Sequence, residues 1–351
     1  MNVVKKLAGK AVQVVCVAGL AGAVVASAES SVSLYGRADA WVGSSRPIGQ
    51  ANRDTLMGSG GMQTSYWGIR GNEELGGGLN AIFALEAFFR MNTGEGGRYQ
   101  GDALYARSAY VGFESPFGSV TVGRNTTPYW MSTAIFNPFS GSFAFSPTIF
   151  HSYGPNGSVA APLVGDSGWD NSILYTTPSM AGLKASVLYA RGEESEDADG
   201  GKNKFGANLL YTSGPFAATL AFQDVDFSST PGDLGAGFKK QRALFAGVTY
   251  DFDVVKVFGN YQRLNNDLRS GAIRTNGGQA GVSIPLGSGS VLASYAYAKT
   301  SDGPGSKRNT WAVGYDYDVS KRTGIYIGYF HDKVSGVGSG DTFGVGIRHG
   351  F

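Results

Sequence analysis

Acid–base chemistry would have to come from very few side chains in this sequence of 351 residues. It contains three histidines, His151, His331 and His349. A hydrolytic site needs a histidine within hydrogen-bond reach of a nucleophile or an acid. His331 directly precedes Asp332, but neighbouring residues of a strand point to opposite faces, so the two are not expected to form a catalytic pair. No phosphate-binding loop or dinucleotide fingerprint is present. We therefore predict that the protein is not an enzyme.

A cluster of carboxylates offers a weak candidate for metal binding. It occupies residues 193–199, with the sequence Glu-Glu-Ser-Glu-Asp-Ala-Asp. EF-hand spacing would require a Glu at position 208 if Asp197 were the first ligand, but that residue is Asn208. One interpretation is a solvated loop, which is typical of charge runs. The other is that Asp197 and Asp199 bind a divalent cation that links this loop to anionic lipopolysaccharide. We expect no cofactor.

The first 28 residues have the pattern of a cleaved secretory signal. Three lysines lead into an apolar run over residues 11–26, and Ala26-Ser27-Ala28 supplies the small residues of a cleavage site. The run is short for a membrane helix, which needs about 20 residues, although an N-terminal anchor helix is the alternative. We predict a signal peptide over residues 1–28 and a mature domain over residues 29–351.

Charge and cysteine content narrow the possible functions of that mature chain. Loss of three signal lysines reduces the basic residues from 29 to 26, against 27 acidic residues, which leaves a net charge of −1. A nucleic-acid partner would require a basic surface, so we expect none. The single cysteine, Cys16, would be removed with the signal. Disulfides and thiol chemistry are therefore excluded for the mature chain.

The mature chain alternates between apolar and polar residues along most of its length. At its end, Phe343, Val345, Ile347 and Phe351 share one parity, opposite a parity rich in Gly, Thr and Arg. This pattern is typical of a strand with one dry and one wet face. The mean hydropathy of the full sequence is nevertheless only −0.10, as expected when lipid-facing and water-facing residues cancel in any average.

Sixteen alternating runs can be counted. Aromatic rings often close the apolar face at the end of a run, as expected for the aromatic girdles of a membrane barrel, for example at Tyr189, Tyr211, Tyr250, Tyr297 and Tyr317. Short Gly- and Pro-rich turns alternate with eight longer loops, at 43–63, 92–103, 125–170, 192–203, 227–239, 264–276, 300–308 and 333–340. We find no sustained helical periodicity.

These features predict an all-β fold, a 16-stranded antiparallel transmembrane β-barrel. Sixteen strands enclose a space too wide for side chains to fill, so an aqueous channel is expected. The longest loop, 125–170, is the candidate for folding inward as a constriction. A soluble β-sandwich or propeller would also alternate, but it explains neither the signal nor the girdles. A small adhesin barrel would need fewer strands.

Several segments carry a specific resemblance to a known family. ESSVSLYGRADAWVG, GIRGNEELGGGLNAIFALE, YARSAYVGFESPFGSVTVGR, NSILYTTPSMAGLKASVLYA and GVGIRHGF resemble the Gram-negative general-diffusion porins of the betaproteobacterial and neisserial type, in the same order along nearly the whole mature chain. The resemblance implies a homotrimeric outer-membrane channel for passive diffusion of small hydrophilic solutes and ions. It also implies contacts with outer-membrane lipid and lipopolysaccharide, and a third loop that forms an eyelet.

The resemblance also implies basic residues in the pore wall. Arg107, in Tyr-Ala-Arg-Ser-Ala-Tyr, matches the family stretch that carries a pore arginine, and Arg124 is a weaker match. At two other positions where relatives often have arginine, this chain has Tyr66 and Gly168, so strong anion selectivity is not expected. Parity alone adds further residues predicted to face the lumen, namely Arg37, Glu86 and Arg90.

The long loop departs from the family pattern in its charge. Between Arg124 and Asp166 it has no Lys, Arg, Asp or Glu, and His151 is its one titratable candidate. Instead it contains many rings, at Tyr129, Trp130, Phe136, Phe139, Phe143, Phe145, Phe150 and Tyr153. Either these rings pack the loop against its neighbours, or they line an aromatic, weakly charged constriction of a more substrate-selective channel.

Overall fold

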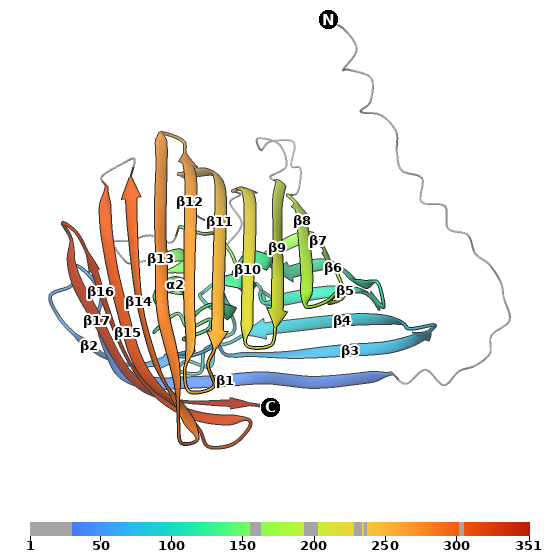
Figure 1. The fold of residues 1–351 in the computed structure, drawn as a ribbon, viewed down its shortest axis with the longest axis horizontal. Helices are drawn as coiled ribbons and strands as arrows, with labels where there is room; N and C mark the ends of the chain where they lie inside the picture. Colours follow the sequence, from blue (N-terminus) through green and yellow to red (C-terminus); the bar gives the residue numbers. More distant parts are fainter. Residues whose placement is uncertain (1–29, 155–162, 193–202, 228–233, 235–236, 302–304) are drawn as a thin grey trace, which may run out of the picture.

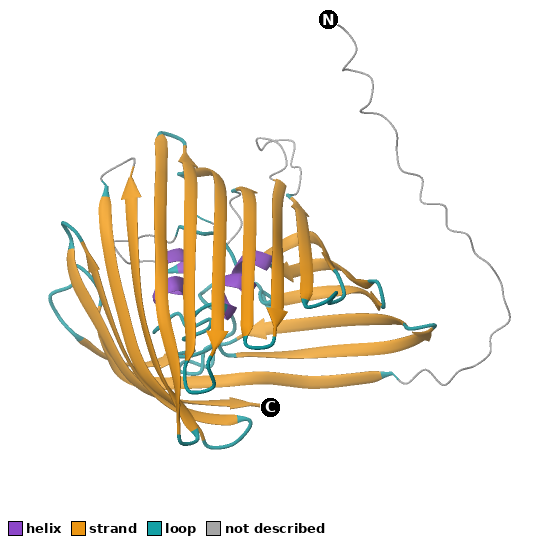
Figure 2. Cartoon of the chain, in the orientation of Figure 1, coloured by secondary structure: helices purple, strands orange, loops and turns teal. Residues whose placement is uncertain are grey.

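A closed antiparallel sheet forms the wall of the molecule. The computed structural model describes residues 30–154, 163–192, 203–227, 234, 237–301 and 305–351, so the predicted signal peptide and the carboxylate cluster at 193–199, with Asp197 and Asp199, lie outside the described residues. Figure 1 shows the strands as a curved wall, and Figure 2 shows the two short helices within its curve. The elements are β1 (Ser31–Arg46), β2 (Asp54–Ser59), β3 (Tyr66–Gly76), β4 (Leu79–Phe88), β5 (Ser108–Ser115), β6 (Gly118–Thr126), α1 (Pro128–Ile135), α2 (Pro147–Tyr153), β7 (Gly168–Thr176), β8 (Leu183–Arg191), β9 (Asn203–Ser213), β10 (Phe216–Asp226), β11 (Phe238–Asp251), β12 (Lys256–Leu268), β13 (Gly271–Leu286), β14 (Gly289–Ser301), β15 (Ser306–Asp318), β16 (Thr323–Val334) and β17 (Gly338–Gly350).

Backbone pairing closes this sheet. From β3 to β17 each strand pairs antiparallel with the next, and β17 pairs with β1, from Arg37↔Gly350 to Arg46↔Asp341. Beyond β17, the N–H of Phe351 donates to the carbonyl oxygen of Gly36 at 3.2 Å. Closure removes the free edges that would leave unpaired backbone groups in lipid. The predicted closed antiparallel barrel is confirmed.

The seventeen strands in the structure occupy sixteen positions around the barrel. β1 pairs with β3 from Ser31 to Arg37 and with β2 from Ala40 to Ser45, so β2 and β3 are two pieces of one interrupted strand. The predicted number of sixteen is therefore confirmed.

A buried carboxylate spans the interruption between β2 and β3. Asp39 is fully buried, and its two oxygens accept hydrogen bonds from the backbone N–H groups of Gly61 at 2.9 Å, Met62 at 3.0 Å and Gln63 at 2.9 Å. The hydroxyl of Tyr326 also donates to it at 2.6 Å. Asp39 thus replaces the ladder bonds that the interrupted strand lacks, which satisfies backbone groups that would otherwise be buried without partners.

The two faces of the wall differ as the alternation predicts. On β11, Leu244 and Val248 are exposed, whereas Gln241, Ala243 and Phe245 on the other parity are buried. The same division runs along the other strands, with large exposed apolar side chains on one face and polar side chains on the opposite face. The exposed apolar face is the one that suits lipid contact. No helix among the described residues is long and apolar enough to cross a bilayer.

Several predicted boundaries were wrong. The predicted loops 43–63, 264–276, 300–308 and 333–340 contain paired strand residues. Between β12 and β13 only residues 269–270 remain unpaired by the ladder, because Asn265↔Arg274 and Leu268↔Gly271 continue it. These strand ends were missed because the alternation of apolar residues stops at the edge of the lipid-facing band. Beyond that edge the backbone still pairs, but the side chains on both faces are polar.

The sequence analysis did not predict two short helices, although neither is a sustained helical stretch. α1 begins after Thr127, whose side chain accepts the N–H of Trp130, and α2 begins after Ser146, which accepts that of Ile149. In both helices a proline follows the capping residue, where its missing N–H costs nothing. Thr127-Pro128 and Ser146-Pro147 were the local signals for these helices.

The hydrogen bonds that Asp39 accepts lead to a stability prediction. Asp39→Ala leaves three backbone donors and the Tyr326 hydroxyl without this acceptor, and each unpaired buried group costs about 1–3 kcal/mol. We expect a loss of at least about 3 kcal/mol in the free energy of unfolding, measured by guanidinium titration of the detergent-solubilised barrel with tryptophan fluorescence. Asp267→Ala, at an exposed carboxylate, should change it by less than about 0.5 kcal/mol. Equal effects of the two substitutions would contradict the role of Asp39.

Candidate functional site

The loop between β6 and β7, residues 127–167 and here called loop three, packs on the polar face of the wall. α1 contacts β8 to β11, and α2 contacts β13 to β15. The exposed apolar side chains lie on the opposite face of the same strands. Because the sheet is closed, the polar face is the inner one. Loop three therefore lies within the barrel, in agreement with the position of the helices in Figure 2.

Uncharged side chains of the inner wall bind this loop. Asn260 donates to the carbonyl oxygen of Phe136 at 3.0 Å, and Gln279 accepts the N–H of Thr148 at 3.0 Å. Ser152 donates to Gln262 at 2.7 Å. Further wall residues of the same kind are Asn208, Thr219, Gln241 and Asn266. These amide and hydroxyl side chains were missed from the sequence, although their placement on the polar parity of β9 to β13 was a usable signal.

Most rings of loop three are buried against the wall. Tyr129, Phe136, Phe139 and Phe145 have relative exposures of 0–1%. Glycines in the wall make room for two of them: a Cβ added at Gly247 would lie 2.7 Å from Phe136, and one added at Gly328 would lie 2.9 Å from Phe145. These four rings therefore serve packing and are not available to line an aromatic constriction.

The part of loop three that faces away from the wall is apolar and uncharged. On α1, Met131 and Ile135 are 45% and 46% exposed, whereas Tyr129, Ser132 and Thr133 are buried. Trp130 and Phe143 remain partly exposed and stack with ring centroids 5.5 Å apart. We call Met131, Ile135, Trp130 and Phe143 the free edge of the loop.

His151 anchors α2 instead of offering a titratable group to the lumen. It is buried, and its Nε2 lies 2.6 Å from Oγ1 of Thr310. The Thr310 hydroxyl donates to Asp332 at 2.6 Å, and Arg308 donates to the same carboxylate at 2.7 Å. Burial lowers the pKa of His151 to about 3, so its imidazole is neutral near pH 7.

The two other histidines contact side chains of neighbouring strands in the wall. His331 packs against Trp311 with ring centroids 5.7 Å apart, whereas the next residue, Asp332, is buried among the inner-face groups. His349 places Nδ1 2.8 Å from Oγ1 of Thr323 on the neighbouring strand. Among the described residues there is also no group of three or more His, Asp and Glu side chains that could hold a metal ion.

Several of the predicted wall residues lie close together. The guanidinium carbon of Arg107 lies 4.0 Å from the ring centre of Tyr66, and Nη1 of Arg107 is 3.2 Å from a carboxylate oxygen of Glu86. The hydroxyl of Tyr35 donates to the other oxygen of Glu86 at 2.6 Å. Arg37 pairs with Tyr66 in the register of β1 and β3. We call these five residues, Tyr35, Arg37, Tyr66, Glu86 and Arg107, the wall group.

Further charged residues extend the wall group towards the turn between β15 and β16. Arg37, Tyr66 and Arg348 line a polar cavity of about 360 Å³, with Lys321 and Arg322 also on its surface. Arg348 is 2.8 Å from Asp316 and 3.6 Å from Asp318. The inner wall here is therefore rich in arginine, although carboxylates offset part of its charge.

Arg124 and Arg90 form their ion pairs with carboxylates outside the wall group. Arg124 forms ion pairs with Asp166 at 2.5 Å and Asp170 at 2.7 Å, and its Nε donates to the carbonyl oxygen of Ala106 at 2.6 Å. Arg90 pairs with Glu95 at 2.8 Å in loop two, residues 89–107. Arg124 is thus engaged in holding loops, and we do not carry it forward as a pore residue.

Asp166 connects loop two to loop three. Arg98 of loop two is 2.7 Å from Asp166 and 2.8 Å from Asp102, and Arg124 contacts the other oxygen of Asp166. We call Arg98, Asp102, Arg124 and Asp166 the loop clamp. Burial alone would raise the pKa of Asp166, but the guanidinium groups of Arg98 and Arg124 hold it below its usual range.

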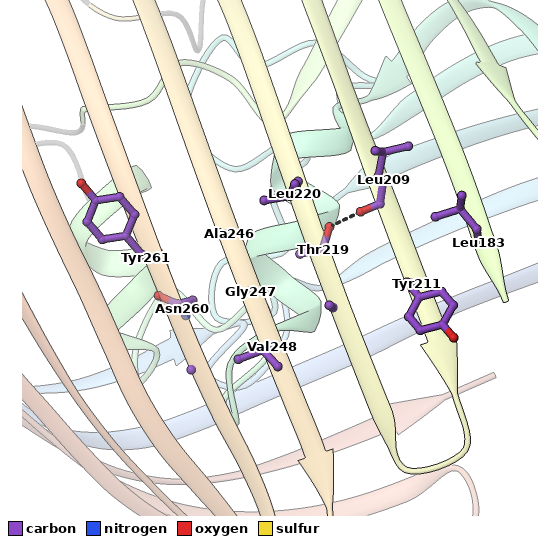
Figure 3. Close-up of a pocket in the computed structure, with 12 residues that line it drawn as sticks. Leu183, Leu209, Tyr211, Thr219, Leu220, Ala246, Gly247, Val248, Asn260 and Tyr261 are labelled. Atoms are coloured by element: carbon purple, nitrogen blue, oxygen red, sulfur yellow. Dashed lines mark hydrogen bonds between the residues drawn. The ribbon is translucent and has the colours of Figure 1, made fainter.

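A depression of about 480 Å³ on the outer face is a separate feature. Figure 3 shows its side chains on β8 to β12, among them Leu209, Leu220 and Val248, with the helices of loop three behind the strands. The exposed side chains of the depression are those of the lipid-facing parity. Because no charged group lines it, we do not regard it as a site for a hydrophilic solute.

Known proteins share this architecture and sequence. A family model described as Gram-negative porin matches residues 13–336. An outer membrane porin protein of Bordetella pertussis is 29% identical, over 95% of this chain and 97% of that protein. Among solved structures, an anion-selective porin from Comamonas acidovorans has a TM-score of 0.76 and 27% identity, and covers 92% of this chain and 100% of its own.

A more distant structure is an outer membrane protein of Vibrio cholerae, solved in a trimer form. It has a TM-score of 0.70 and 14% identity, over 92% of this chain and 99% of its own, which indicates a shared fold only. The geometry, the family model and the relatives agree on a channel rather than an enzyme. The chain belongs to the Gram-negative porin family, and it forms a sixteen-strand outer-membrane barrel with a water-filled channel for passive diffusion of small hydrophilic solutes and ions.

Proposed function

We propose that the narrowest part of the channel lies between the free edge of loop three and the wall group, and that it favours anions weakly. The observation that carries this proposal is the charge distribution: loop three has no Lys, Arg, Asp or Glu between Arg124 and Asp166. The charges of the constriction then come from the wall alone. The main contacts of the loop-three helices are with β8 to β11 and with β13 to β15, which supports a passage on the other side of the barrel, beside β3 to β5.

Compensation of arginine by a neighbouring carboxylate keeps the anion preference weak. Glu86 lies 3.2 Å from Arg107 and compensates its charge, whereas Arg37 and Arg348 add positive charge nearby. A unit charge at 4 Å contributes about 1 kcal/mol in water. An imbalance of one charge therefore changes ion partition by a factor of about five. The solved porin from Comamonas acidovorans, described as anion-selective, supports the direction of this preference.

We also propose that the protein is a homotrimer in the outer membrane. The family resemblance implies this assembly, and the Vibrio cholerae protein of the same fold was solved in a trimer form. Lipid and lipopolysaccharide would then contact the exposed apolar parity of the wall that stays outside the subunit contacts.

Ion selectivity tests the role of the wall group. Reversal potentials in a KCl gradient across a planar bilayer should show a preference for chloride. Arg37→Gln should lower the chloride-to-potassium permeability ratio on the order of two- to fivefold, and Glu86→Gln should raise it by a similar factor, because each removes one charge from the lumen. Arg242→Gln, at an exposed arginine on the lipid-facing parity of β11, is the matched control and should leave the ratio unchanged. If all three variants behaved alike, the wall group would not set selectivity.

The loop clamp generates a pH prediction. Since ion pairs lower the folded-state pKa of Asp166, the clamp contributes its full stability above the ordinary value of 3.8 and loses it as the pH falls through the lowered value. Open-channel current noise should therefore increase below about pH 3.8. Asp166→Asn should produce the same noise at pH 7, whereas Asp267→Asn should not. Quiet currents in Asp166→Asn would show that the clamp does not hold loop three.

Trimeric assembly is tested by the same recordings. One inserted particle should close in three equal current steps under high voltage, because each subunit encloses its own channel. Chemical crosslinking of membranes should give a ladder that ends at three subunits. Single-step closure with a ladder that ends at one subunit would contradict the assembly.

A further inference from the structure

A second cavity lies inside the barrel, beside loop three and near the ends of the strands that carry the longer loops. Its volume is about 520 Å³, within the range of about 300–1,000 Å³ typical of small-molecule sites. It lies between the ends of β1, β2, β16 and β17 and the segment of loop three that includes Phe143 and Phe150. It shares no residue with the wall group and differs from the outer depression in Figure 3.

Aromatic rings form one side of this cavity. Trp41, Phe143, Phe150 and Phe330 line it, and the rings of Phe150 and Phe330 meet edge to face with centroids 4.8 Å apart. Phe143 and Phe150 are partly exposed, in contrast to the fully buried rings of loop three. Rings that are held rigidly and partly open to solvent suit a flat apolar group that stacks on or packs edge to face against them.

The polar end of the cavity carries excess positive charge. Arg46 and Asp341 line it, with Nη2 of Arg46 3.1 Å from the carboxylate. Arg53 pairs with the other oxygen of Asp341, so two guanidinium groups share one carboxylate. Asp332, the remaining carboxylate of the lining, is paired with Arg308 at 2.7 Å. The net charge of these five groups is therefore +1.

Arg46 also has an unused donor. Its Nε is buried and has no hydrogen-bond acceptor among the described residues. A buried donor without a partner costs free energy that an incoming acceptor would recover. Carboxylates bind arginine through paired hydrogen bonds, so a carboxylate is the group that best completes this end.

We propose that this cavity is a binding subsite for small aromatic carboxylates on their way through the channel. The ring packs among Trp41, Phe143 and Phe150, and the carboxylate binds Arg46. This site shares Phe143 with the free edge of loop three but has no residue in common with the wall group, and it recognises a solute by combining a ring with a negative charge. Weak, reversible occupancy would raise the local concentration of such solutes inside the barrel without requiring a gate.

Isothermal titration calorimetry of the detergent-solubilised full barrel tests the proposal with four probes. Benzoate has both features, acetate lacks the ring, benzyl alcohol lacks the charge, and benzylammonium has the opposite charge. We expect benzoate to bind at least tenfold more tightly than each of the other three. Equal affinity for acetate would indicate nonspecific anion binding, and tighter binding of benzylammonium would reverse the charge assignment. Either result overturns the proposal.

Three variants locate the binding. Arg46→Gln should reduce benzoate affinity to that of benzyl alcohol, and Phe143→Ala should weaken benzoate and benzyl alcohol alike, each by roughly tenfold. Arg242→Gln removes an arginine outside the cavity and should leave benzoate binding unchanged. Circular dichroism verifies that each barrel is folded, and Phe143→Leu, which keeps bulk but loses the ring, replaces Phe143→Ala if the latter fails to fold. Unchanged benzoate affinity in the folded Arg46 and Phe143 variants would place the binding elsewhere.

Discussion

Complete pairing of the backbone in a closed sheet is the constraint on which the rest of this structure depends. In lipid an unpaired N–H or C=O has no water to bind, so the strands must close into a ring. The pairing of β1 with β17 closes it. Where β2 and β3 interrupt one strand position, the buried carboxylate of Asp39 accepts three backbone N–H groups instead. Even the irregular part of the wall therefore obeys the same requirement.

Closure with sixteen strand positions leaves an interior that loop three partly fills. The loop is held by neutral groups, such as the hydrogen bond from Asn260 to Phe136 and the ring of Phe136 beside Gly247. Ion pairs are concentrated at the loop clamp, where Asp166 joins Arg98 and Arg124. This division explains how a loop with hardly any charge can keep a fixed position in a water-filled barrel, and why its free edge can be apolar.

Much of the barrel could be predicted because alternation is a local property of strands. Phe343, Val345 and Ile347 were assigned to one face from parity alone, and all three are exposed in the structure. The strand ends around Asn265 and Arg274 could not be predicted this way, since pairing there continues without apolar side chains. The helices were missed because helices of eight and seven residues are too short to show a clear periodicity, although Thr127 and Ser146 marked their starts.

The sequence by itself determined the strand faces, the order of long and short connections and the lack of charge in loop three, because these depend only on neighbouring residues. Only the tertiary structure decided which groups meet. Arg124 matched a pore position in the sequence but is paired with Asp166, and Arg46 meets Asp341 across a separation of 295 residues. Such contacts depend on ring closure and on the path of loop three, which no local pattern of residues encodes.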